Sequence, residues 1–357
     1  AFIAANGGSA NAYTAGDHTN YYFDVMPAVL RPAMDRFAQF FIAPRLDPGY
    51  VDREKNAVDS EYQSQSKDDG WRGNAAFKAA MNPDYPGSRF TIGNLETLGD
   101  GVLGALMTFF DSQYSANQMA LVVLSNEPLD QLAKWLAPLF AKLPNKNLER
   151  PKAIAKAFTE SQLPLTLYYR PLKDERRVSF NFPVADRAPH YRHKPEDYIA
   201  NLLGHEGAGS LHHVLTERGW IEWLSAGDTR LDAANGFINV DIGLTEIGAQ
   251  HVDDITHMLF AYIDLLKSNE PELWRYAEQA TVAELGFRFF EQSTAAQFVS
   301  ALSPEFALYP PEDVISANFL MAEFDPELIK SYLARLTPAN LVREIVAPDV
   351  TTDQVEP

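Results

Sequence analysis

Two glutamates, Glu54 and Glu61, lie seven residues apart in the stretch from Val51 to Asp69. We expect this stretch to form a helix, and because about seven residues make two helical turns, both carboxylates would lie on one face. Such a pair could provide one hard metal ligand and a second carboxylate that supports it. It could also form a solvated acidic face, and the spacing does not decide between these two interpretations.

Other catalytic chemistry has little support in the sequence. No pair among the eight histidines forms H-E-x-x-H or H-x-x-E-H, whereas a catalytic zinc site usually needs three protein ligands. The absence of Cys excludes thiolate metal ligands and a cysteine nucleophile, and no G-x-S-x-G elbow supports serine catalysis. The segment GHEGAGSL lacks the Lys of a phosphate-binding loop, so its glycines are better explained by a helix start. We interpret the histidines as structural or solvated: His18, His190, His193, His205, His212, His213, His251 and His257.

Composition limits the class of protein and its partners. A chain of 357 residues with 46% hydrophobic residues is long enough for two folded domains. A membrane-spanning helix needs about 20 consecutive apolar residues, and no apolar run in this sequence is close to that length. The net charge of −18 disfavours nucleic acid and anionic membrane surfaces, since phosphate groups are bound by clustered Lys and Arg. We therefore expect neither nucleic acid nor a membrane as a partner.

The order strand, helix, turn, helix occurs twice along the chain. The first copy has a strand at 21–25, an amphipathic helix at 28–42, a Pro-containing turn at 44–48 and the helix that carries the two glutamates. The second copy reads GFINVDIGL, GAQHVDDITHMLFAYIDLL, NEP and ELWRYAEQATVAELGFRFF. Asp241 of the second strand lies 217 residues after Asp24 of the first, which suits two copies of one α/β domain.

The offset between the copies predicts the domain limits. In the second copy the strand follows LPLTLYYR, RRVSFNFPV and a helix that contains His205, and the counterpart of this helix in the first copy would precede residue 1. We expect residues 1–150 to form a first domain that lacks its first strands and one helix, so that residues 1–5 are the end of a helix. Residues 151–345 would form the second domain and 346–357 a connector, with a charged, Pro-bearing linker at about 143–158.

Five segments resemble the pitrilysin and insulinase group of inverted-motif zinc metallopeptidases. They span nearly the whole chain in the order of that family and read GGSANAYTAGDHTNYYFDV, AMDRFAQFFIAPRLD, DREKNAVDSEYQ, LLGHEGAGSLHHVLTERGW and YPPEDVISANFLMAEFDPELI. The resemblance implies an α/β (α+β) fold of two homologous domains, each with a mostly antiparallel sheet packed against helices. It also implies that the chain is the N-terminal half of such a protease.

The resemblance assigns roles to the two glutamates. In that family an H-x-x-E-H helix upstream of GGSxNAYT supplies two histidine ligands and the general base, and we expect this helix upstream of residue 1. The Glu of NAVDSE, which is Glu61 here, would be the third ligand of one Zn²⁺ per intact protein. Glu54 of DRE would be a supporting acid that fixes a ligand histidine.

The resemblance also implies substrate-binding residues. Asn11 and Ala12 of NAYT match a family segment that lies along the substrate strand. The stretch GWIEWLSAG, with Trp220, Leu224 and Gly227, resembles the exosite that anchors a substrate by strand addition.

The function implied is that of a zinc-dependent metalloendopeptidase, which hydrolyses peptides and small proteins through a metal-activated water. Residues 1–357 would be inactive without the other ligands and without the C-terminal half of the same protease as a partner. The resemblance and the lack of Cys are compatible with a bacterial periplasm. The alternative is a non-catalytic scaffold or partner subunit of the same superfamily, which the retained Glu61 disfavours; an unrelated α/β binding protein is a third interpretation.

Overall fold

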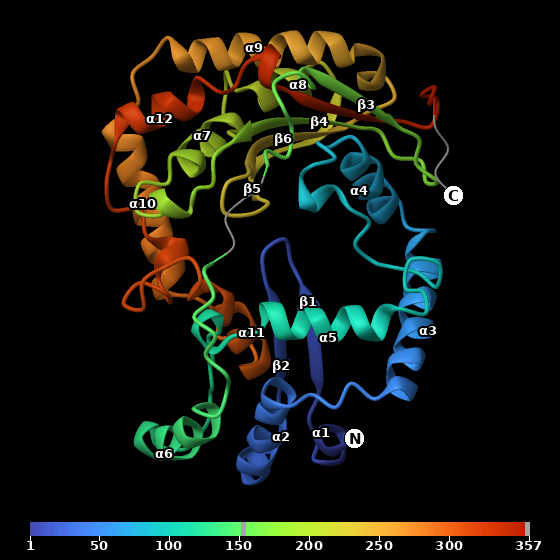
Figure 1. Cartoon of the computed structure of the whole chain (residues 1–357). Helices are drawn as coiled ribbons and strands as arrows, with labels where there is room; N and C mark the ends of the chain where they lie inside the picture. The colour runs from blue at the N-terminus through green and yellow to red at the C-terminus, as the bar shows by residue number, and fades with distance from the viewer. Residues whose placement is uncertain (151–154, 354–357) are drawn as a thin grey trace. The chain divides into compact units, whose positions relative to one another are not determined.

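The computed structural model describes residues 1–150 and 155–353 (Figure 1). By internal contacts the chain divides into two compact units. Unit 1 comprises Ala1–Tyr62, Ile92–Lys152 and Glu291–Ile315, and unit 2 comprises Gln63–Thr91, Ala153–Phe290 and Ser316–Pro357. The predicted domain limits stay a prediction, and the predicted linker and connector lie partly outside the described residues, at 151–154 and 354–357.

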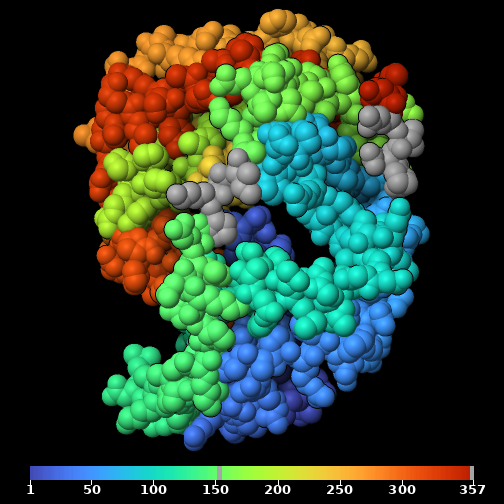
Figure 2. Space-filling model, viewed as in Figure 1, coloured from blue at the N-terminus to red at the C-terminus, as the bar shows by residue number. Residues whose placement is uncertain are grey.

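Unit 1 contains a two-stranded antiparallel sheet of β1 (Ala10–Thr14) and β2 (Thr19–Phe23). Its helices are α1 (Phe2–Ala5), α2 (Leu30–Ile42), most of α3 (Pro48–Gln65), α5 (Val102–Gln113), α6 (Leu129–Phe140) and α11 (Ala295–Glu305). In α5 no residue is buried, and Figure 2 shows this helix at the surface of unit 1.

Side chains from distant parts of the sequence hold unit 1 together. The predicted apolar stripe of α2 packs on β2, where the rings of Phe37 and Phe23 lie 5.0 Å apart and those of Phe41 and Tyr21 lie 5.4 Å apart. The buried Asn20 of β2 donates a hydrogen bond of 2.7 Å to a backbone carbonyl of α11. This contact explains why residues 291–315 belong to unit 1.

The helix predicted at 51–69 is interrupted in the structure. Helix α3 ends at Gln65, and a new helix, α4 (Asp69–Ala79), begins four residues later. The side chain of Asp68 accepts a hydrogen bond from the backbone N–H of Trp71 and so caps the start of α4. The prediction missed this break because Asp68 is a polar residue of a kind that also occurs within helices.

Unit 2 is built around a five-stranded sheet in the order β3-β7-β4-β6-β5 (Figure 1). The strands are β3 (Leu165–Tyr169), β4 (Arg177–Val184), β5 (Ile221–Arg230), β6 (Gly236–Leu244) and β7 (Val342–Val346). Only the β3–β7 pair is parallel among the described strands, and the other pairs are antiparallel. The predicted fold class, with mostly antiparallel sheets packed against helices, is confirmed.

One face of this sheet carries the main core of the protein. Val178, Phe180 and Phe182 alternate along β4 and are fully buried, as the period of a strand with one apolar face requires. The same core contains residues of α7 (Pro195–Leu203), α8 (Leu211–Glu217), α9 (Val252–Lys267) and α12 (Pro326–Leu333). Unit 2 also contains α4 and α10 (Leu273–Arg288), and α10 contributes Tyr276 to this core.

The opposite face of the sheet carries a smaller apolar cluster at one end, which includes Phe237 and Val342, and polar side chains elsewhere. We call this side of the sheet the polar face. Ser179 of β4 lies opposite Asp241 of β6, and the Ser179 hydroxyl donates a hydrogen bond to the Asp241 carboxylate. Asn239 donates a second hydrogen bond of 2.8 Å to the same carboxylate. On β7, Glu344 accepts a hydrogen bond of 3.0 Å from Asn181. The alternation of each strand therefore places polar side chains together on this face.

No helix in the described part of the chain is long and apolar enough to cross a membrane.

Candidate functional site

The two predicted glutamates lie on α3 with their side chains exposed. The helix begins after Asp47, whose carboxylate accepts a hydrogen bond of 3.0 Å from the N–H of Gly49, and Pro48 occupies a position that favours helix starts. Neither Glu54 nor Glu61 forms a hydrogen bond or ion pair with another described residue. Both carboxylates are thus available to other groups.

The described residues do not assemble a zinc site by themselves. Among them there is no group of three or more His, Cys, Asp or Glu side chains that could hold a metal ion. Glu61 offers one carboxylate, whereas a catalytic zinc usually takes three protein ligands. The roles of Glu61 as a metal ligand and Glu54 as a supporting acid therefore stay predictions.

Asn11 and Ala12 lie on β1, where all residues are exposed. They pair with Tyr22 and Tyr21 of β2. Because the β1–β2 sheet has two strands, the other edge of β1 has no strand partner among the described residues. This edge is open to an extended chain, and the substrate-binding role of the two residues stays a prediction.

Of the three predicted exosite residues, Trp220 directly precedes β5, and Leu224 and Gly227 lie within it. Trp220 is 9% exposed, and its indole stacks on the ring of His251 at 4.3 Å between centroids. Leu224 is 7% exposed and belongs to the main core. Gly227 is half-buried. Since the Leu224 side chain is inside the protein, this residue can meet a peptide only through its backbone. The Trp220 side chain is also buried, and its backbone N–H and C=O are hydrogen-bonded to Leu215 and Thr245.

The structure shows β5 at the end of the sheet order. Its inner edge pairs with β6 from Ile221 to Arg230, whereas within the described residues no backbone hydrogen bond joins the outer edge of 222–229 to another segment. An unpaired edge of this length presents a row of N–H and C=O groups to which an extended peptide can add as a further strand. The open edge agrees with the predicted mode of peptide binding.

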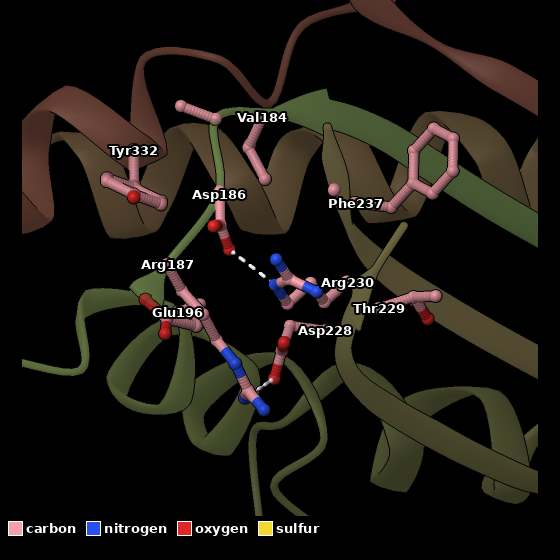
Figure 3. Close-up of a pocket in the computed structure, with 11 residues that line it drawn as sticks. Val184, Asp186, Arg187, Glu196, Asp228, Thr229, Arg230, Phe237 and Tyr332 are labelled. Atoms are coloured by element: carbon pink, nitrogen blue, oxygen red, sulfur yellow. Dashed lines mark hydrogen bonds and ion pairs between the residues drawn. The ribbon is translucent and has the colours of Figure 1, made fainter. Parts of the chain in front are cut away.

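A charged cluster that the sequence did not reveal lies beside the same strand (Figure 3). It surrounds a cavity of about 10 Å³, which holds on the order of one water molecule. Arg187 forms an ion pair of 2.8 Å with Asp228 of β5, and Arg230 forms one of 3.1 Å with Asp186. The cavity is too small for a peptide side chain, so the cluster is not a substrate pocket.

Glu196 of α7 is the least satisfied member of this cluster. It is 1% exposed, and neither of its carboxyl oxygens has a hydrogen-bond partner in the described structure. Burial is the main reason that the pKa of Glu196 is raised to about 7. The nearby carboxylates of Asp197 and Asp228 act in the same direction, whereas the backbone N–H of Glu196 itself and Arg187 act to lower the pKa. The burial of Glu196 could not be predicted from the sequence, because an acidic residue just after Pro195 is typical of an ordinary helix start.

Models of one protein family match the chain along nearly its whole length. Residues 1–84 match insulinase (peptidase family M16), and residues 103–281 match the peptidase M16 inactive domain. Residues 287–357 match the middle or third domain of peptidase M16.

Curated relatives extend well beyond this chain. The insulin-degrading enzymes of Bos taurus and Homo sapiens are each 39% identical over 99% of this chain and 36% of the relative. The A-factor-processing enzyme of Saccharomyces cerevisiae is 34% identical over 99% of this chain and 35% of the relative. The chain therefore spans about a third of the length of these relatives.

Solved structures show the same fold. The crystal structure of pitrilysin superposes with a TM-score of 0.96 at 30% identity, over 99% of this chain and 38% of that chain. A peptidase M16 inactive domain from Pseudomonas fluorescens superposes with a TM-score of 0.67 at 17% identity, over 99% of this chain and 84% of that chain.

Proposed function

Since the chain belongs to the insulinase family of peptidases, family M16, as its sequence predicted, we propose that it is part of a zinc-dependent metalloendopeptidase that hydrolyses peptides and small proteins. Its partner would be the C-terminal half of the same protease. A periplasmic location stays a prediction.

The observation that carries this proposal is the agreement with pitrilysin, a TM-score of 0.96 at 30% identity over 99% of the chain. Two relatives are named for degrading insulin and for processing A-factor, so the proposed substrates are peptides and small proteins. The relatives named as enzymes do not favour the alternative of a non-catalytic subunit.

In this function, residues 1–357 would serve to bind the peptide. The outer edge of β5 offers unpaired backbone groups, and strand addition there would supply affinity through main-chain hydrogen bonds. The open edge of β1, with Asn11 and Ala12, would bind an extended peptide segment through the same kind of backbone hydrogen bonds.

For the metal, we propose that Glu61 supplies one ligand of a single Zn²⁺ and that Glu54 positions a histidine ligand. By the resemblance to the inverted-motif metallopeptidases, the two histidine ligands and the general base would come from an H-x-x-E-H helix upstream of residue 1. No catalytic step is derived for this chain, and we expect it to cleave no peptide by itself.

The test uses the longer protein and this chain side by side. In the longer protein, Glu61→Gln should lower both the zinc content, measured by mass spectrometry, and the hydrolysis of a quenched fluorescent peptide. Glu278→Gln on the exposed surface of α10 is the matched control and should change neither. Full zinc content and activity in the Glu61→Gln protein would show that the assignment is wrong, and stoichiometric zinc in purified residues 1–357 would contradict the proposed ligand set.

A further inference from the structure

Trp223 is a large apolar residue that the proposed function has not yet used. It is 43% exposed, although it lies within β5. A register irregularity between Ile221 and Trp223 places Trp223 opposite Gly243, on the polar face of the sheet. Without this bulge the indole would point to the same side as the buried Ile221.

The indole of Trp223 is held against the backbone of β6. A β-carbon at Gly243 would overlap the indole nitrogen Nε1 and its neighbouring carbon atoms. Only glycine leaves room for this contact. The indole therefore has a fixed position on the polar face while much of its surface remains exposed.

The residues that follow on the same face of β5 are small. Ser225 is exposed, and at Gly227 a β-carbon would meet nothing within 4 Å. The surface beside the indole is thus a shelf with little side-chain volume of its own. This shelf, made of Trp223, Ser225 and Gly227, borders the open edge of the sheet.

The carboxylate that lies opposite the shelf is not free to bind a cationic occupant. The acidic group opposite Ser225 is Asp241. Its carboxylate already accepts hydrogen bonds from Ser179 and Asn239 and lies 3.6 Å from the guanidinium of Arg177. Because this carboxylate is satisfied, it offers little to a Lys or Arg side chain.

We propose that the shelf of Trp223, Ser225 and Gly227 is a subsite for an aromatic side chain of an extended peptide that adds to the outer edge of β5. This proposal rests on the proposed function and specifies its substrates. Alternate side chains of the added strand point to the polar face, and diagonal neighbours about 7–8 Å apart are within reach of aromatic rings. The unpaired N–H and C=O groups of the open edge can pair with the backbone of an extended segment. A helix cannot pair with them in this way, because its backbone groups are already hydrogen-bonded within the helix.

The test measures binding of fluorescein-labelled peptides to residues 1–357 by fluorescence anisotropy. Each peptide is a short Ser, Thr and Gly sequence with one Phe, Ala or Arg at successive positions. At one position the Phe peptide should bind about tenfold more tightly than the Ala peptide. The Arg peptide should bind like the Ala peptide.

Three variants connect this preference to the shelf. Trp223→Ala should abolish the preference for Phe, and Trp223→Phe should retain most of it. Gly227→Val should also abolish it by filling the shelf, and the open space at this position should leave the fold intact. Trp274→Ala, at an exposed position of α10, is the control and should change nothing.

The possible results of this experiment distinguish a failure of the aromatic subsite from a failure of the proposed peptide-binding function. Equal binding of the Phe and Ala peptides, or a preference for Arg, would overturn the aromatic subsite and leave the strand-binding edge in place. Binding of no peptide would overturn both. If Trp223→Ala does not fold, as judged by circular dichroism, the Trp223→Phe and Gly227→Val proteins decide.

Discussion

Replacing Glu196 by Gln tests how the buried charged cluster beside β5 affects stability. The Glu196 carboxyl is 1% exposed and lacks a hydrogen-bond partner in the described structure. When it ionises, the new charge must remain in a poorly solvated place beside Asp197 and Asp228. Glutamine has the same shape and cannot ionise, so it isolates the effect of the charge.

The magnitude follows from the pKa of Glu196, which is raised from an ordinary 4.5 to about 7. This difference corresponds to about 3 kcal/mol of folding free energy. At low pH the carboxyl is protonated in both states and gives no difference. As the pH rises from about 4.5 to about 7, the unfolded chain releases its proton first, so the folded state loses stability relative to it.

The free energy of unfolding of the Glu196→Gln protein, minus that of the wild type, should therefore rise by about 3 kcal/mol between pH 4.5 and pH 8. Any cost of burying the amide is the same at every pH and cancels in this comparison. The measurement is urea unfolding followed by tryptophan fluorescence. Four of the five tryptophans lie in unit 2, so a Trp135→Phe background makes the signal report on that unit.

The control is Glu278→Gln, an exposed position on α10, for which the same difference should stay flat. A Glu196→Gln protein whose stability follows that of the wild type across the whole pH range would refute this account. It would show that Glu196 is solvated in the folded protein or has a partner there.

Three further substitutions test other parts of the structure by urea unfolding. The buried Asp69 carboxylate accepts hydrogen bonds from the N–H groups of Leu172 and Lys173, so Asp69→Ala should cost about 3 kcal/mol. Burial acts to raise the pKa of Asp69, but these bonds outweigh it and lower the pKa, so this contribution should be lost as the pH falls below about 4. Phe180→Ala empties a fully buried core position and should cost about 3–5 kcal/mol; a cost below that of a surface change would contradict the assigned core. Thr294→Ala removes the capping box of α11 and should cost about 1 kcal/mol, with no effect expected from Thr351→Ala at an exposed position.

The sequence predicted the elements whose pattern depends on near neighbours. Buried residues at every second position of β4 and at every fourth position of α9, Ile255, Leu259 and Ile263, follow directly from the geometry of a strand and a helix. The break at Asp68 was missed because a capping residue has no periodicity and only a local hydrogen bond identifies it.

For the candidate site, too, the sequence predicted some features and the tertiary structure decided others. Glu54 and Glu61 were assigned through a motif, and the structure places them on one exposed helix, as their spacing requires. Trp220 and Leu224 were selected for a region that binds peptides, yet their side chains are inside the protein. Sequence similarity identified the segment, and burial decided which atoms of that segment face outward.

What the sequence determined by itself is the family, the fold class and most of the helices and strands, because these depend on motifs and on spacing along the chain. Only the tertiary structure decided that β7 lies between β3 and β4, that β5 is left at the edge, and that Glu196 is buried. Each of these depends on contacts between residues far apart in the chain, such as the 62 positions that separate Ser179 from Asp241. The open edge and the indole shelf arise from those contacts, so patterns among neighbouring residues in the sequence do not predict them.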